Sequence, residues 1–232
     1  MLSVRVPGFL PGTAGFRFPN AFPHTPVRSI GVPGLLTVPI GDAADGLCGG
    51  MVFAARDYFE AGRPPPPEPD PPAGGTPLFD YLVRRLFDSF ELPRGPVRYL
   101  ELMNPALPDG DGFLARIGLV PHGRAWRTIR DEWPGIRAEL DARRPCPLGL
   151  VRIRSLNPFD LKHNHQVLAY GYDLDGSDLT LWVYDPNRPG DDAVTISLSL
   201  GDPRRATAVT TAIPGRPVVA LFRVGYRAAT PP

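Results

Sequence analysis

Two different hydrophobic patterns follow one another along the chain. In the first two thirds, apolar residues recur at helical spacing in three segments, which run from Cys48 to Gly62, from Leu78 to Phe90 and from Gly123 to Arg143. After residue 144, short β-rich runs are separated by turn residues. These runs predict five strands, over Leu148–Arg154, His165–Tyr172, Leu179–Tyr184, Val194–Leu200 and Val218–Val224. Helices followed by a sheet predict an α+β fold.

Turn and breaker residues organise the rest of the chain. Asp175-Gly176 predicts a hairpin between the second and third strands. The proline-rich stretch from Arg63 to Gly75 predicts a stiff surface connector, with a polyproline ligand of an SH3-type domain as the alternative. A loop-rich stretch is expected between the second helix and Pro121. The sequence thus predicts one domain over residues 1–232, made of an extended N-terminal segment wrapped on the surface (1–45), a mainly helical part (46–144) and an antiparallel sheet part (145–226).

Composition excludes several classes of function. A net charge of +1 over 232 residues does not predict a surface for nucleic acid or anionic membranes. No stretch approaches the roughly 20 apolar residues that a membrane span needs. The N-terminus, Met1–Gly8, lacks the apolar run of a signal peptide. We therefore expect a protein that is cytoplasmic, or exported without a cleaved signal peptide.

Cysteine and histidine usage limits the metal and redox chemistry. The two cysteines do not form a disulfide framework, and Cys146 is interpreted as a small buried hydrophobic residue before a strand. His163 and His165 form a His-x-His pair, but no further cysteine or histidine completes a set of metal ligands. The sequence therefore predicts neither a metal ion nor a cofactor.

The other cysteine, Cys48, lies in Gly46-Leu47-Cys48-Gly49-Gly50 at the start of the first predicted helix. Backbone N–H groups in the first turn of a helix stabilise a thiolate over a thiol. The glycines on both sides are expected to leave room for a substrate backbone. This context predicts a cysteine nucleophile.

A histidine and a carboxylate follow at matching places in the sheet part. His165 starts one predicted strand and Asp185 follows the next, so an antiparallel hairpin brings them together. Asp185 would accept a hydrogen bond from the imidazole and fix its tautomer. His163 is the competing base, and Asn187 is the alternative orienting residue. Cys48, His165 and Asp185 are thus the predicted catalytic residues.

The order Cys, His, Asp resembles that of the papain-like cysteine peptidases, and especially of bacterial proteins similar to bacteriocin-leader-processing peptidases, with no assigned substrate. The resemblance is carried by Gly46–Gly50, by the strand that His165 starts and by Asp185-Pro186. The aromatic-Pro-Asn-aromatic segment Phe18–Phe22 is similar to one in such bacterial proteins. The resemblance implies a nucleophile at the start of a central helix, with the histidine and its partner on adjacent strands of a C-terminal antiparallel sheet.

One position departs from the papain-like pattern. A glutamine six residues before the cysteine usually donates to the oxyanion, but here that residue is Asp42, an acceptor. The Cys48 backbone N–H and the side chain of Asn20 are the candidate donors. The expected function is a cysteine hydrolase that cleaves a peptide or amide bond of a peptide or protein substrate. The alternatives are an inactive papain-like binding module and an acyl or peptidyl transferase that uses the same site.

Overall fold

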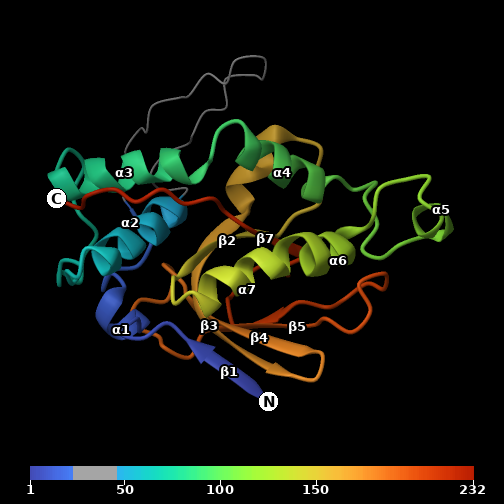
Figure 1. The fold of residues 1–232 in the computed structure, drawn as a ribbon. Helices are drawn as coiled ribbons and strands as arrows, with labels where there is room; N and C mark the ends of the chain where they lie inside the picture. Colours follow the sequence, from blue (N-terminus) through green and yellow to red (C-terminus); the bar gives the residue numbers. More distant parts are fainter. Residues whose placement is uncertain (23–45) are drawn as a thin grey trace.

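An antiparallel sheet and a group of helices packed against it form the protein (Figure 1). The computed structural model describes residues 1–22 and 46–232. Within these residues the strand order is β6-β5-β4-β3-β2-β7, and β1 pairs with β3. The strands are β1 Leu2–Arg5, β2 Cys146–Val151, β3 His165–Asp175, β4 Asp178–Tyr184, β5 Thr195–Ser199, β6 Thr210–Thr211 and β7 Ala220–Arg223.

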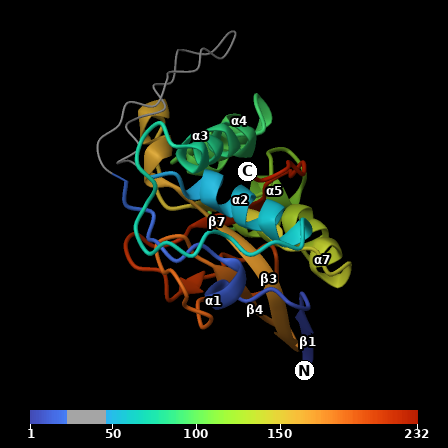
Figure 2. The ribbon, with the colours of Figure 1, turned by 90° about the vertical axis from the view of Figure 1, so that its left-hand side faces the viewer.

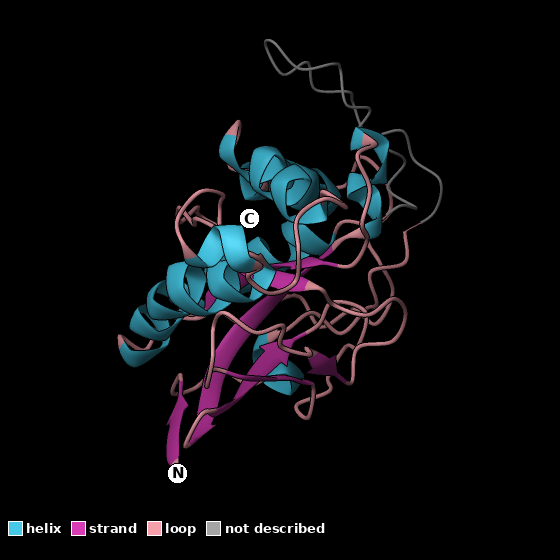
Figure 3. Ribbon diagram, turned by 90° about the vertical axis from the view of Figure 1, so that its right-hand side faces the viewer, coloured by secondary structure: helices cyan, strands magenta, loops and turns pink. Residues whose placement is uncertain are grey.

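The longer helices lie on one side of this sheet (Figures 1 and 2). The helices are α1 Pro11–Ala14, α2 Cys48–Glu60, α3 Pro77–Ser89, α4 Arg94–Met103, α5 Phe113–Arg116, α6 Arg124–Trp126 and α7 Trp133–Asp141. A π-helical segment, Arg127–Glu132, joins α6 to α7, and a 3-10 turn covers Pro158–His163. The predicted α+β class is therefore confirmed, and the longer helices and the strands form separate groups in space (Figure 3).

Local sequence explains several element boundaries. The Thr76 side chain accepts a hydrogen bond from the Phe79 N–H and caps α3, whose first residue is Pro77. Gly176 has a φ of +57° in the turn between β3 and β4, which is the hairpin predicted from Asp175-Gly176. The capping threonine and the turn glycine are strong local signals, so the sequence predicts these two element boundaries to within one or two residues.

The expectation for the N-terminal segment is wrong for the part that the structure describes. Residues 2–5 form β1, and Val4 pairs with Tyr172 of β3. Four phenylalanines that follow are buried in the core: Phe9, Phe16, Phe18 and Phe22. Burial of these rings explains why residues 1–22 are an integral part of the fold instead of a surface wrap. Residues 23–45 lie outside the described part of the chain.

The loop-rich stretch expected before Pro121 contains a ten-residue helix, α4. Its prolines suggested loops, but Pro96 lies in the first turn, where the missing N–H costs no intrahelical bond. Tyr99, Leu102 and Met103 are buried along one face of α4. The third predicted helix, over Gly123–Arg143, is present as α6, the π-helical segment and α7, which follow one another without a break from Arg124 to Asp141.

None of the helices in the described residues is long and apolar enough to cross a membrane.

Candidate active site

Cys48 is the first residue of α2, as the sequence predicts. The turn before it is held by Asn20, whose Oδ1 accepts a hydrogen bond from the Leu47 N–H at 2.6 Å. Gly46 has a φ of +96°, a conformation that favours glycine, and a side chain there would approach Asn20 Nδ2 to 2.6 Å. These contacts fix where the helix starts and therefore where the thiol lies.

The hairpin of β3 and β4 brings His165 and Asp185 together. Leu168 pairs with Tyr184, so the start of β3 lies beside the end of β4. Nε2 of His165 is 2.7 Å from Oδ1 of Asp185. The exposed fraction is 5% for the histidine side chain and 0% for the carboxylate. A buried carboxylate at this distance fixes the orientation of the imidazole and stabilises its protonated form.

The imidazole of His165 lies beside the thiol of Cys48, and the interaction between the two groups shifts the pKa of both. Burial raises the pKa of Cys48, but the hydrogen bond and charge of His165, with the N–H groups of Gln166 and Gly49, outweigh burial and lower the pKa below 9.0. Burial lowers the pKa of His165, whereas Asp185 and Cys48 raise it, with a net result of about 9. Both shifts favour a thiolate beside an imidazolium.

Two asparagines connect the start of α2 with the turn after β4. The Asn20 backbone N–H donates to the Pro186 carbonyl at 2.9 Å, and its Nδ2 donates to Oδ1 of Asn187 at 3.3 Å. Nδ2 of Asn187 is 3.4 Å from His165 Nε2, farther than Asp185 Oδ1. The distances therefore favour Asp185 over Asn187 as the orienting residue. Because both ends of the Asn20 amide are engaged, its contacts favour a positioning role over donation to an oxyanion.

The glycines after Cys48 have a different role from the one expected. A Cβ at Gly50 would lie 2.1 Å from the Leu82 carbonyl oxygen, and one at Gly49 would lie 2.2 Å from Ser89 Oγ. Helices α2 and α3 approach so closely that no side chain fits between them. The expectation that these two glycines leave room for a substrate backbone is wrong, because their faces are occupied by α3 and its side chains.

Two neighbours of the site were not predicted. The backbone N–H of Gln166 helps to lower the pKa of Cys48, and the side-chain Oε1 of Gln166 is buried with no hydrogen-bond donor within the described residues. The Tyr99 hydroxyl donates to the His165 carbonyl at 3.3 Å. Gln166 is a polar residue that stands between His165 and apolar Val167 in the sequence. Its polarity is a signal from which its place beside the site could have been predicted. Tyr99 lies in the helix that the sequence did not reveal.

Three other residues considered in the sequence lie away from this cluster or outside the described part. His163 ends the 3-10 turn, is exposed, and has its Nε2 3.7 Å from Oδ1 of Asp160. Its prediction as a competing base is not supported, because it does not contact Cys48. Cys146 is fully buried and unpaired, as expected for a small hydrophobic residue. Asp42 lies outside the described residues.

A second histidine–carboxylate pair lies in another region. Nδ1 of His122 is 2.7 Å from Oδ2 of Asp111, whose other oxygen accepts from the Gly123 N–H. The His122 ring stacks on Trp126 with centroids 3.9 Å apart. This pair has the same 2.7 Å separation as His165–Asp185, but it is made through Nδ1 instead of Nε2, and neither cysteine contacts it.

Residues 1–22 and 46–232 contain no cluster of three or more His, Cys, Asp or Glu side chains able to hold a metal ion. Comparisons with protein-family models, with curated proteins and with solved structures gave no significant match for this chain. The geometry of the site is therefore the basis for the function proposed below.

Proposed function

We propose that the protein is a papain-like cysteine hydrolase that cleaves a peptide or amide bond through a thioester intermediate. One observation carries the proposal: the thiol at the start of α2 interacts with His165, which shifts the pKa of both groups, and Nε2 of this histidine is 2.7 Å from the buried carboxylate of Asp185. A structural cysteine needs neither a basic partner nor a carboxylate behind that partner.

In the first half of the reaction, the Cys48 thiolate attacks the carbonyl carbon of the substrate. Because Nε2 of His165 faces Asp185, Nδ1 is the ring nitrogen left for the thiol and the substrate. The tetrahedral intermediate collapses as the carbon–nitrogen bond breaks, and the imidazolium proton passes to the leaving amine. The acyl group remains on sulfur as a thioester, and His165 is then neutral.

In the second half, neutral His165 accepts a proton from water, and the resulting hydroxide attacks the thioester carbonyl. Collapse of this intermediate breaks the carbon–sulfur bond and releases a carboxylic acid. The thiolate and the imidazolium are restored, so the cycle balances with one water consumed. Asp185 keeps its charge throughout and stabilises the imidazolium.

The oxyanion of both intermediates needs hydrogen-bond donors. The Cys48 N–H has no acceptor within the described residues and lies at the positive end of the α2 dipole. It is the proposed backbone donor. Asn20 supports this donor indirectly, because it fixes the Leu47 N–H and with it the path of the chain into the helix.

An active ester tests the proposal without knowledge of the substrate. The protein is mixed with p-nitrophenyl acetate, and the release of p-nitrophenol is followed together with the intact mass. We expect a burst of one equivalent and an acetyl group on Cys48, both absent in Cys48→Ala. A slow release without a burst, equal in both proteins, would contradict the proposal and favour the inactive binding module. A peptide library then tests for amide cleavage.

A further inference from the structure

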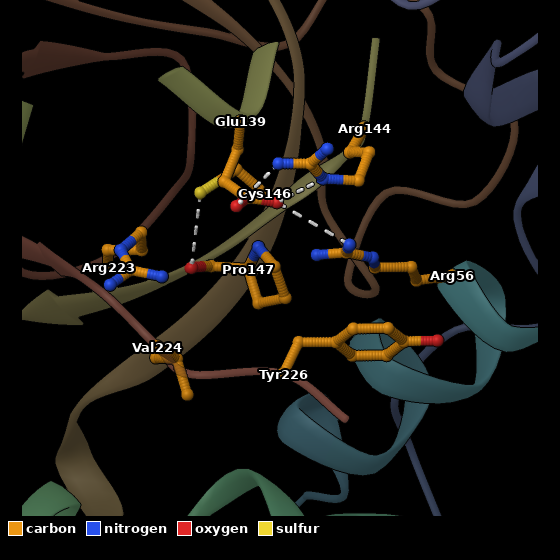
Figure 4. A pocket seen from close by; sticks show the side chains of 8 residues that line it. All are labelled: Arg56, Glu139, Arg144, Cys146, Pro147, Arg223, Val224 and Tyr226. Carbon is orange, nitrogen blue, oxygen red and sulfur yellow. Dashed lines mark hydrogen bonds and ion pairs between the residues drawn. The ribbon is translucent and has the colours of Figure 1, made fainter. Parts of the chain in front are cut away.

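A pocket of about 190 Å³ lies away from the candidate active site, where the second half of α2 meets the ends of β2 and β7. Its lining residue on α2, Arg56, follows Cys48 by eight positions, or about 12 Å along the helix axis. Figure 4 shows the pocket, which is lined by Arg56, Glu139, Arg144, Cys146, Pro147, Arg223, Val224 and Tyr226.

Positive charge dominates this pocket. Three guanidinium groups line it, with one carboxylate, that of Glu139. Both Glu139 oxygens accept hydrogen bonds from Arg144, at 3.0 and 3.1 Å. These hydrogen bonds hold the pKa of Glu139 below its usual range although burial raises it, so the residue stays ionised. Glu139 is thus neutralised mainly by Arg144, and Arg56 is paired with Glu60 beside the pocket, so the guanidinium of Arg223 is the one left in excess among the residues that line the pocket.

The two other arginines face each other across the pocket (Figure 4). The Arg223 backbone is fixed on both sides, since its N–H donates to Glu132 and its carbonyl accepts from Arg98. Its guanidinium, by contrast, makes no hydrogen bond or ion pair within residues 1–22 and 46–232. Five N–H donors at the end of an anchored residue are therefore available to a ligand.

Arg56 is held in place before any ligand arrives. Its side chain is only 6% exposed, and Nε donates to Glu60 at 2.7 Å. The guanidinium lies over the Tyr226 ring, 3.8 Å from the ring centroid, and its Nη2 is 3.5 Å from Glu139. A preorganised guanidinium loses little entropy on binding, which favours affinity.

We propose that this pocket binds a small oxyanion of the phosphate class, either inorganic phosphate or the phosphoryl group of a phosphomonoester, between Arg56 and Arg223. Planar guanidinium groups bind tetrahedral oxyanions through pairs of parallel hydrogen bonds. An anion would neutralise the charge of Arg223 and lie against the preorganised guanidinium of Arg56, and the volume limits the ligand to a small group. The site is independent of Cys48 and of the reaction proposed for it.

The test is a titration of the full chain with inorganic phosphate at constant ionic strength, followed by calorimetry and by phosphorus NMR. We expect saturable binding at one site. Arg223→Gln should weaken it by about tenfold or more, since a charge-assisted hydrogen-bond pair is lost. The matched control is Arg205→Gln, which changes an exposed arginine outside the pocket and should leave the affinity unchanged.

A second variant should change the affinity for phosphate in the opposite direction. Glu139→Gln removes the one carboxylate of the pocket but keeps an acceptor for Arg144, so phosphate should bind more tightly. Methyl phosphate distinguishes the ligand sources: binding of both anions supports a phosphomonoester site, and binding of phosphate alone supports a site for the free ion. Absence of saturation, or equal affinities in Arg223→Gln, Arg205→Gln and the unchanged protein, would overturn the proposal.

Discussion

The two cysteines of this chain have opposite environments. Cys48 begins a helix, is partly exposed and contacts a histidine, which lowers its thiol pKa. Cys146 begins the strand β2 and is fully buried. Burial, with Glu139 nearby, raises the pKa of the Cys146 thiol to about 12. The same side chain is therefore favoured as a thiolate in one region and kept as a neutral thiol in the other.

The comparison shows that reactivity here is set by partners and not by exposure alone. Burial disfavours the charged thiolate at both cysteines. At Cys48, the imidazole of His165 and two backbone N–H groups outweigh that penalty. The thiol of Cys146 donates a hydrogen bond to the Pro147 carbonyl, an acceptor that favours the protonated form. Removing the partners of Cys48 should thus make it resemble Cys146.

The largest expected effect follows from exchanging the nucleophile. Cys48→Ser should reduce burst formation and amide cleavage below detection, because a serine hydroxyl is not ionised by a neighbouring histidine alone at neutral pH. Cys146→Ser should leave both near the unchanged level, since Cys146 is not part of the site. The assay is kcat/KM, with circular dichroism as the check on folding. Loss of activity only in a folded Cys146 variant would contradict the assignment.

The next effect concerns the carboxylate behind the histidine. Asp185→Asn keeps the shape of the side chain but removes the charge that stabilises the His165 imidazolium. The chemical step should slow, by up to about 10⁴ as in a serine–histidine–aspartate site. The matched control is Asp111→Asn, which changes an equally short contact to His122. An equal loss of activity in the two variants would show that the effect comes from folding and not from the site.

A smaller effect is expected at Asn20. Asn20→Ala leaves the buried Leu47 N–H without its acceptor, which should lower the free energy of unfolding by about 1–3 kcal/mol. It also frees the helix start from the turn after Asp185, so kcat should fall less than in Asp185→Asn. Urea unfolding and kcat measure the two effects. Asn157→Ala is the control, because Asn157 caps an exposed 3-10 turn; a kcat loss of the same size there would argue against a positioning role.

Local signals in the sequence were enough to predict much of this arrangement. The hairpin turn at Gly176 and the strand pattern on each side place His165 near Asp185, since antiparallel register follows from the turn. The start of α2 was also predicted, because the pattern changes from glycine-rich to helical at Cys48. The structure brings these three residues together, while their catalytic role stays a prediction.

Long-range packing accounts for what the sequence did not reveal. In the sequence, Gly49 and Gly50 suggest a path for a substrate. In the structure they allow the close approach of α3, more than thirty residues away, with the Ser89 side chain at Gly49 and the Leu82 carbonyl at Gly50. Asn20 has no local signal for its bonds to Leu47 and Asn187, which lie far along the chain. Helix α4 was not predicted, because prolines in this stretch are typical of loops although one face of the helix is apolar. Tyr99 lies on this helix and was therefore not predicted either.

His165 lowers the pKa of the Cys48 thiol and so favours the thiolate. The most direct measurement is the rate of alkylation by iodoacetamide at each cysteine, followed by mass spectrometry as the pH is varied, in the unchanged protein and in His165→Gln. Glutamine keeps a donor for Asp185 but carries no charge, and circular dichroism confirms that the variant folds.

The pKa shifts of Cys48 and His165 give the direction of the expected pH dependence. A thiol reacts as its thiolate, so alkylation of Cys48 should follow a pKa below 9.0, the ordinary value of a thiol. His165 should keep its proton as the pH rises to about 9, so hydrolysis should decline above that value as the leaving amine loses its proton donor. In His165→Gln the pH dependence of Cys48 alkylation should move upward, and Cys146 should stay unreactive in both folded proteins. A Cys48 profile centred at or above 9.0 and unchanged in His165→Gln would contradict the account.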